Sequence, residues 1–217
     1  MDTFISYSSD IKKTAGKVKA CLDTYGFNCF LAHEDIQPQT FWPEEIVKAL
    51  KKCDLFLPLL TPGFTTSFFC QQETGFAYCR KIEILPVMIS KAPMGMIADL
   101  QAVKFNEQDL ENSCWKIVDH VAKKTSLSGK LLDALITLFG ESEHYDDACE
   151  WAQYLLSGFT FTSSQISAIK KYIEDNSQIN ETKKARNVIF KFMEKHPTFF
   201  NDDFVNWYDK KSRTHMR

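Results

Sequence analysis

The first 125 residues alternate short apolar runs with stretches that repeat apolar residues at helical spacing. The run that ends at Leu60 is almost continuous, as in a strand that is covered on both faces. A strand–helix alternation with short connections predicts a parallel sheet with helices on both faces. The expected strands are Thr3–Tyr7, Phe27–Leu31, Asp54–Leu60, Ile82–Ile89 and Val103–Phe105.

Three residues mark the ends of the predicted helices. Gly26 stands where a helix should stop, because glycine easily adopts the conformation that ends a helix. Pro43 suits a first helical position, where a missing N–H costs nothing, and Ser67 can cap the next helix. We therefore expect an α/β fold, a flavodoxin-like doubly wound five-stranded parallel sheet, with ligands beyond the carboxyl ends of the strands. The expected helices cover residues 11–25, 43–53, 67–80 and 107–123.

The pattern changes near Ser126, where the strand-like runs disappear. Thr162–Ser164 and Asn180–Thr182 look like capped helix starts. We predict two domains, an α/β domain over residues 1–125 and a small all-helical C-terminal domain over residues 126–217. The expected helices of the second domain are Leu131–Phe139, Asp147–Leu156, Ser164–Asp175 and Thr182–Lys195.

Composition and charge exclude several classes of protein. The formal net charge is −2 and no Lys/Arg stripe is interleaved with aromatic residues, so we expect no nucleic-acid partner. The apolar stretches, such as Leu55–Leu60, are far shorter than the ~18 residues of a membrane span, and no signal peptide is visible. The seven cysteines form no CxxC pair, which indicates reduced thiols and no metal site. We expect a cytoplasmic protein without a membrane anchor.

Polar residues follow the first expected strand, at the predicted ligand edge of the sheet. The segment is Tyr7-Ser8-Ser9-Asp10. Small hydroxyl side chains at this point let a ligand approach the backbone. The alternative is that Ser9 or Asp10 only caps the next helix.

The connection after the second strand, residues 32–43, contains two adjacent aromatic residues, Phe41 and Trp42. Aromatic side chains in a loop are costly to expose unless they pack on the domain, a partner or a ligand. We expect one of the two to pack on the following helix and the other to face a ligand or a subunit.

A third cluster lies in the helix expected after Ser67. Phe69 and Glu73 are four residues apart and share one helix face. This pair suits a nucleoside, because the ring can stack on a base while the carboxylate binds ribose hydroxyls. The alternative is a solvated surface glutamate, which the spacing alone does not exclude. Cys70 is interpreted as a buried thiol, since no sequence feature supplies a base for it.

Three segments in register resemble the motifs of bacterial Toll/interleukin-1 receptor (TIR) domain proteins. Thr3–Asp10 (TFISYSSD) resembles the first TIR signature. Phe30–Trp42 (FLAHEDIQPQTFW) is similar to the second strand and the BB loop, and Phe64–Glu73 (FTTSFFCQQE) to the segment that leads to a catalytic glutamate. The resemblance covers residues 1–125, and the helical region resembles tails of some bacterial TIR proteins.

The resemblance implies either an enzyme or a scaffold. Some TIR domains split NAD⁺ into nicotinamide and ADP-ribose or a cyclic isomer, and others only recruit further TIR domains. The glutamate of the catalytic members falls on Glu73, and NAD⁺ is then the substrate, with no further cofactor. The substrate pocket of the family maps to Tyr7, Ser8, Ser9, Phe41, Trp42 and Phe69.

The chain departs from the family pattern in two ways. Phe69 stands where some catalytic TIR domains have tryptophan, and a phenylalanine ring can still stack with less area. Ser8 and Ser9 stand where some animal members have basic residues, so phosphate contacts must come from backbone amides or from elsewhere.

We therefore expect a TIR-domain NAD⁺ glycohydrolase or ADP-ribosyl cyclase, an NAD⁺ nucleosidase that acts in bacterial antiphage defence signalling. The resemblance also implies a homo-oligomer formed through TIR–TIR contacts and a trigger protein at the helical domain. The first alternative is a non-enzymatic TIR scaffold, which needs neither Glu73 nor the aromatic residue before it. A response-regulator-like receiver is disfavoured, because it needs clustered acids at the end of the first strand and an aspartate at the end of the third, where this chain has Ser8-Ser9-Asp10 and Leu60-Thr61. A deoxyribosyltransferase-like enzyme is a more distant alternative.

Overall fold

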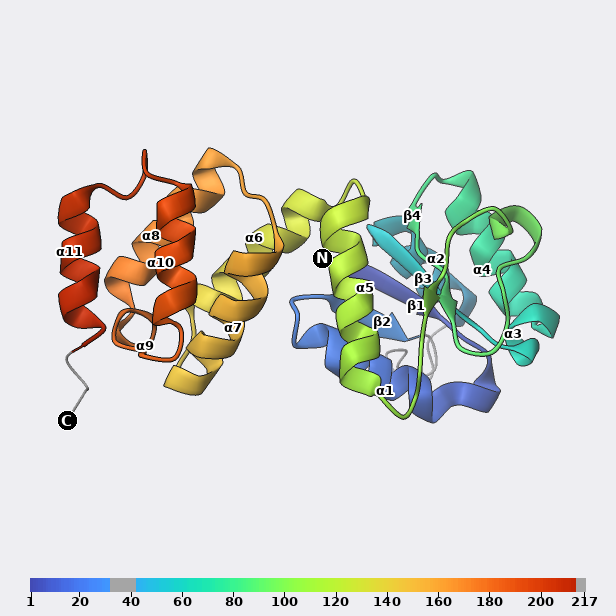
Figure 1. Cartoon of the computed structure of the whole chain (residues 1–217). Helices are drawn as coiled ribbons and strands as arrows, with labels where there is room; N and C mark the ends of the chain where they lie inside the picture. Colours follow the sequence, from blue (N-terminus) through green and yellow to red (C-terminus); the bar gives the residue numbers. More distant parts are fainter. Residues whose placement is uncertain (32–41, 214–217) are drawn as a thin grey trace. The chain divides into compact units, whose positions relative to one another are not determined.

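The computed structural model describes residues 1–31 and 42–213, and a parallel sheet forms the centre of the first part of the chain (Figure 1). The strand order is β2-β1-β3-β5-β6, and β4 also pairs with β3. Every strand pair among the described residues is parallel. The strands are β1 (Asp2–Ser6), β2 (Asn28–Leu31), β3 (Leu55–Leu60), β4 (Glu83–Ile84), β5 (Val87–Met88) and β6 (Val103–Lys104).

The expected strand Ile82–Ile89 is split into β4 and β5. β4 pairs with the first half of β3, and β5 pairs with its second half. Pro86 lies at the break, where its missing N–H interrupts the ladder, while the neighbouring Leu85 amide still donates to the Phe56 carbonyl at 3.0 Å. β4 and β5 share one strand position, so the sheet has five positions and the flavodoxin-like prediction is confirmed.

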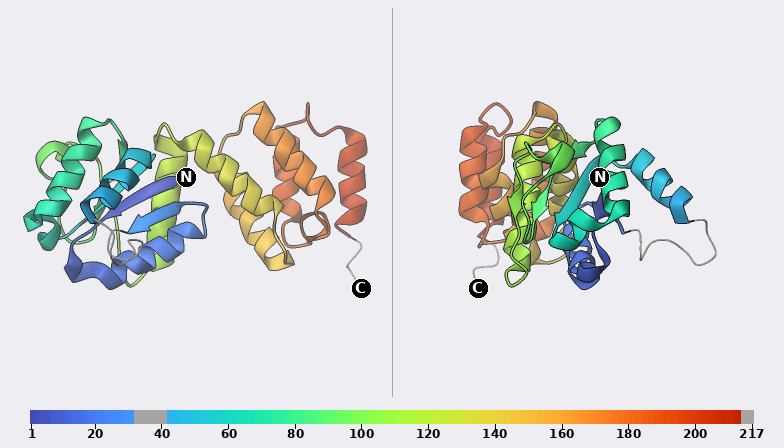
Figure 2. Two further views of the ribbon diagram at one scale, coloured as in Figure 1. Left: turned by 180° about the vertical axis from the view of Figure 1, so that it is seen from behind. Right: turned by 90° about the vertical axis from the view of Figure 1, so that its right-hand side faces the viewer.

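Helices cover both faces of the sheet, as a doubly wound fold requires. α1 and α5 pack together on one face, whereas α2 and α4 pack against β1 and against each other. The right-hand view of Figure 2 shows α5 and α2 on opposite sides of the strands. The elements are α1 (Lys12–Asp23), α2 (Trp42–Lys52), α3 (Pro62–Thr66), α4 (Phe68–Cys79) and α5 (Leu110–Lys124), with 3₁₀ turns η1 (Ser9–Ile11) and η2 (Gly95–Ile97).

Local caps define where these helices begin and end. The Ser67 hydroxyl accepts from the Cys70 amide at 3.3 Å, which confirms Ser67 as the cap of α4. Gly26 follows α1 with a φ of 79°, a conformation that other residues rarely adopt. The apolar pattern does not predict α3, which begins at Pro62 and is capped by the Thr61 side chain.

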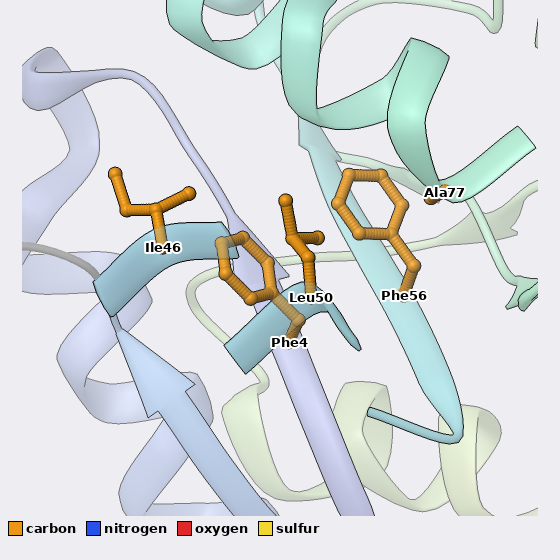
Figure 3. Close-up of a cluster of buried hydrophobic side chains, with 5 residues drawn as sticks. All are labelled: Phe4, Ile46, Leu50, Phe56 and Ala77. Carbon is orange, nitrogen blue, oxygen red and sulfur yellow. The ribbon is translucent and has the colours of Figure 1, made fainter. Parts of the chain in front are cut away.

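An aromatic cluster attaches α2 and α4 to the sheet (Figure 3). The Phe4 ring lies between two others, with its centroid 5.3 Å from that of Phe30 and 5.7 Å from that of Phe56. The side chains that complete the cluster come from α2 and α4 and are Ile46, Leu50 and Ala77. This cluster holds α4 close to β1, the strand that begins the chain.

The chain divides into two compact units, Met1–Leu131 and Leu132–Arg217, and the division falls inside α6. The predicted boundary after residue 125 lies ahead of this division, at the end of α5. The described part of the second unit is entirely helical (Figure 2, left view), and no described helix is long and apolar enough to cross a membrane. The helices after α5 are α6 (Ser128–Gly140), which the two units share, α7 (Tyr145–Gly158), α8 (Ser163–Asp175), α9 (Ser177–Asn180), α10 (Arg186–Lys195) and α11 (Asp202–Lys211).

One of the two predicted caps in the second unit is confirmed and the other is wrong. Thr162 begins α8 in a capping box with Gln165, each side chain bonding the other residue's backbone amide. Asn180 instead ends α9, and its buried side-chain amide donates to the Glu174 carbonyl. α10 therefore begins later, at Arg186, and no side-chain hydrogen bond caps it.

Replacing Phe4 by alanine should destabilise the first unit by about 3–5 kcal/mol, because the deleted ring leaves a cavity between its two aromatic neighbours. Phe68→Ala is the control, since the Phe68 side chain is 84% exposed. We expect the control to change the free energy of unfolding by less than about 0.5 kcal/mol in urea titrations. Equal losses in the two variants would contradict this packing.

Candidate functional site

Glu73 lies on the face of α4 that packs against the sheet. Cys70, Thr74 and Ala77 are buried on this face, and the helical spacing of three and four residues places Glu73 beside them. The Glu73 residue is only 7% exposed. The alternative of a solvated surface glutamate is therefore wrong.

The Glu73 carboxylate meets the last residue of β1. The Ser6 hydroxyl donates to Oε2 of Glu73 at 2.5 Å, and Ser6 is 1% exposed. Side chains alternate along a strand, so Ser6 points to the same face as Phe4, which is the face covered by α2 and α4. β1 lies between β2 and β3, where the strand order reverses, and ligands of such sheets bind beyond this point.

Burial changes the acidity of Glu73. Loss of solvent raises the pKa of the carboxyl from its ordinary value of 4.5 to about 7, and the hydrogen bond from Ser6 partly opposes this rise. Near neutral pH, Glu73 is therefore present in both its protonated and its ionised form. Groups with such balanced ionisation are common in functional sites.

The Cys70 thiol borders the same pair of residues. It is 2% exposed, and burial together with the neighbouring negative charge of Glu73 raises its pKa, while hydrogen bonding with the side chains of Ser67 and Ser6 partly opposes the rise. A thiol that stays protonated is a weak nucleophile. The interpretation of Cys70 as a buried structural thiol is confirmed.

A second polar cluster joins the ends of β1 and β3. The Ser8 hydroxyl donates to the Asp10 carboxylate and lies 3.1 Å from Oγ1 of Thr61. The Asp10 carboxylate lies over Gly63. A Cβ atom at position 63 would come within 2.7 Å of Asp10 Oδ1, so any larger residue at this position would displace the carboxylate. No side chain of Ser9 or Asp10 caps α1, and the capping alternative for these residues is wrong.

The remaining predicted site residues lie in different environments. Tyr7 is buried at 6% exposure, Ser9 is exposed at the start of η1, and Phe69 is 53% exposed one helical turn before Glu73. Trp42 is the first residue of α2, but its side chain lies outside the described part of the chain. Phe41 falls outside the described residues altogether.

Ser6 and Thr61 were not among the predicted site residues. Ser6 carries a detectable signal, because it is a polar residue at a position of the strand pattern that faces the core. Thr61 carries a weaker one, as the hydroxyl residue directly after a fully apolar strand. Neither pattern indicates which helix residue the hydroxyl contacts.

A cavity of about 370 Å³ beside β2 is separate from this site, because Glu73 does not line it. The cavity is lined by three lysines, and each already has a carboxylate partner. The ion pairs are Lys48–Glu45 at 2.7 Å, Lys52–Asp2 at 3.3 Å and Lys19–Asp23 at 3.7 Å.

The raised pKa of Glu73 predicts a pH-dependent cost of folding. The folded protein favours the protonated carboxyl, so Glu73 costs almost no folding free energy below pH 4.5, and the cost is complete once the pH has risen through about 7. Glu73→Gln, which stays neutral, should therefore have a larger free energy of unfolding than wild type near pH 8, by up to about 3 kcal/mol. The difference should nearly vanish at pH 4.5. Urea titrations at both pH values measure it, and no gain near pH 8 would contradict the burial.

The sequence model of the TIR domain family matches residues 3–117, more than half of the chain. Among solved structures, the TIR domain of the Toll-related receptor TRR-2 from Hydra magnipapillata is 16% identical, with a TM-score of 0.47 over 54% of this chain and 94% of that chain. No curated protein matches the sequence. On the evidence of the family match, the chain belongs to the TIR domain family.

Proposed function

We propose that this chain is an NAD⁺ nucleosidase that cleaves the nicotinamide–ribose bond, with Glu73 as the essential carboxylate. The observation that carries the proposal is a buried glutamate at the carboxyl end of β1, held by the Ser6 hydroxyl. Burial of an ionisable group costs folding free energy, and such groups are concentrated at functional sites. A scaffold that only binds other TIR domains does not need this arrangement.

The chemistry requires one negative charge near the ribose. Nicotinamide leaves with the electron pair of the C1′–N bond and needs no general acid, because it is already cationic in NAD⁺. The ribose becomes positively charged as this bond breaks, and an ionised Glu73 in a poorly solvated site stabilises that charge. Water then forms the C1′–O bond of ADP-ribose and releases a proton to solvent, or a nucleophile of the same molecule closes a cyclic product.

Phe69 is the proposed platform for a ring of the substrate. It lies four residues before Glu73 on α4, and about half of the side chain remains exposed. An aromatic ring in this position supports binding of a flat heterocycle next to the carboxylate. Tyr7, Ser8 and Ser9, with Phe41 and Trp42 from the connection between β2 and α2, complete the proposed substrate site.

Exposed apolar side chains favour self-association of the first unit. Phe68 is 84% exposed and Met96 65% exposed, and TIR domains commonly self-associate. We propose a homo-oligomer through TIR–TIR contacts, a trigger protein at the helical unit and a role in antiphage defence. The same surface favours the second candidate function, a TIR–TIR scaffold without activity.

Purified protein at high concentration should release nicotinamide from NAD⁺, as measured by chromatography of the products. Glu73→Gln should lose about 10³-fold or more of this rate, because the charge that stabilises the transition state is removed. Glu111→Gln is the matched control, an exposed residue of α5, and should keep the wild-type rate. No turnover by wild type, even in crowded assemblies, favours the scaffold.

Phe69→Ala should raise the KM for NAD⁺ about tenfold through loss of ring stacking, with a smaller change in kcat. Tyr78→Ala is the control, because its ring is exposed to a similar degree (52%) further along α4 and belongs to neither the proposed substrate site nor the proposed self-association surface. Steady-state kinetics of the two variants measure the difference. Equal effects at the two positions would argue against a substrate contact at Phe69.

A further inference from the structure

The Ser6 hydroxyl is the protein group that holds the Glu73 carboxylate. It donates to Oε2 at 2.5 Å, and no described residue donates to Oε1. The Ser6 backbone is fixed by its place in the sheet, where β1 pairs with β3 so that Ser6 lies opposite Pro58. One carboxylate oxygen is therefore engaged by the sheet, and the other makes no hydrogen bond to a described residue.

We propose that Ser6 is a positioning residue, which favours the ionised form of Glu73 and leaves Oε1 for the ribose of the substrate. This inference rests on the proposed function and names the residue that prepares the carboxylate for it. Ser6 itself does not touch the reacting atoms. Its proposed effect reaches the reaction through Glu73.

The electrostatic argument follows from the balance of two effects. Burial favours the protonated carboxyl, whereas a hydroxyl that donates its proton to Oε2 favours the ionised form. Hydrogen bonds to charged groups are stronger than those between neutral groups. Removal of the hydroxyl leaves burial unopposed, so Glu73 should ionise only at a higher pH.

Few other titratable groups oppose or support Glu73. α3, β3 and η2 contain no titratable residue, and on α4 the Cys70 thiol is the one that interacts with the carboxylate. The charged residues on the other elements packed against α4 are Asp2 of β1, Glu44, Glu45, Lys48, Lys51 and Lys52 of α2, and Glu83 of β4. None of these contributes to the pKa of Glu73, which is set by burial and Ser6.

A purely structural role for Ser6 predicts a different outcome. Loss of packing at a buried position would lower activity at every pH, without moving the pH at which activity appears. A role through ionisation moves that pH and leaves the activity at high pH nearly unchanged. The pH profile of kcat/KM, which reports the ionisation of the free enzyme, separates the two roles.

The test measures kcat/KM for NAD⁺ as a function of pH in wild type, Ser6→Ala and Ser113→Ala. Ser113 of α5 is a matched control, because its buried hydroxyl bonds the backbone of Asn106, which precedes this helix, and not Glu73. In Ser6→Ala, the acid limb of the kcat/KM profile should lie about one pH unit higher than in wild type. Its kcat/KM should then be about fivefold lower than that of wild type at pH 7 and nearly equal to it at about pH 9. An unmoved limb, or a uniform loss at all pH values, would overturn the inference.

A second measurement does not depend on turnover. The side-chain carboxyl carbon of Glu73 can be titrated by ¹³C NMR and assigned by its absence in Glu73→Gln. Ser6→Ala should raise the titration midpoint by about one pH unit, and an unchanged midpoint would contradict the role of Ser6. Absence of NAD⁺ cleavage in wild type would defeat the proposed function separately, because this titration would still report on Ser6 and Glu73.

Discussion

Burial of the Glu73 carboxylate against the end of β1 is the constraint on which the candidate site depends. A carboxylate that leaves water loses solvation, and the protein compensates for part of this loss with the Ser6 hydroxyl. The result is a pKa of about 7, so the charge is present at neutral pH but is weakly compensated. Such a charge interacts strongly with a positive charge that develops beside it.

The rest of the first unit keeps these two groups together. Ser6 cannot shift easily, because β1 is paired on both sides, with β2 and with β3. Glu73 is placed by the cap at Ser67, which sets the start of α4, and by the packing of Ala77 in the cluster around Phe4 and Phe56. The hydrogen bond between Ser6 and Glu73 forms only while both groups stay in place, so the site depends on a core that lies beneath it and contains no catalytic group.

The sequence predicted the sheet and its flanking helices well, because long periodic patterns and caps such as Ser67 are local signals. The short helix α3, which begins at Pro62 after the Thr61 cap, was not predicted. The start of α10 was also misplaced, because the Asn180 side chain donates to the Glu174 carbonyl of α8 and does not cap α10. The burial of Glu73 was also beyond the sequence. Its partner Ser6 lies 67 positions away, and a helix pattern alone does not show which face meets the sheet. The predicted contributions of Phe41 and Trp42 stay predictions, since neither side chain is described.

The central claim is that this TIR domain breaks one particular bond of NAD⁺. Real-time ¹H NMR of NAD⁺ mixed with concentrated wild-type protein at about pH 8, where Glu73 is ionised, tests it most directly. The account predicts that free nicotinamide appears together with ADP-ribose or a cyclic isomer. Unchanged NAD⁺, or cleavage at the pyrophosphate that leaves nicotinamide attached to ribose, would contradict it.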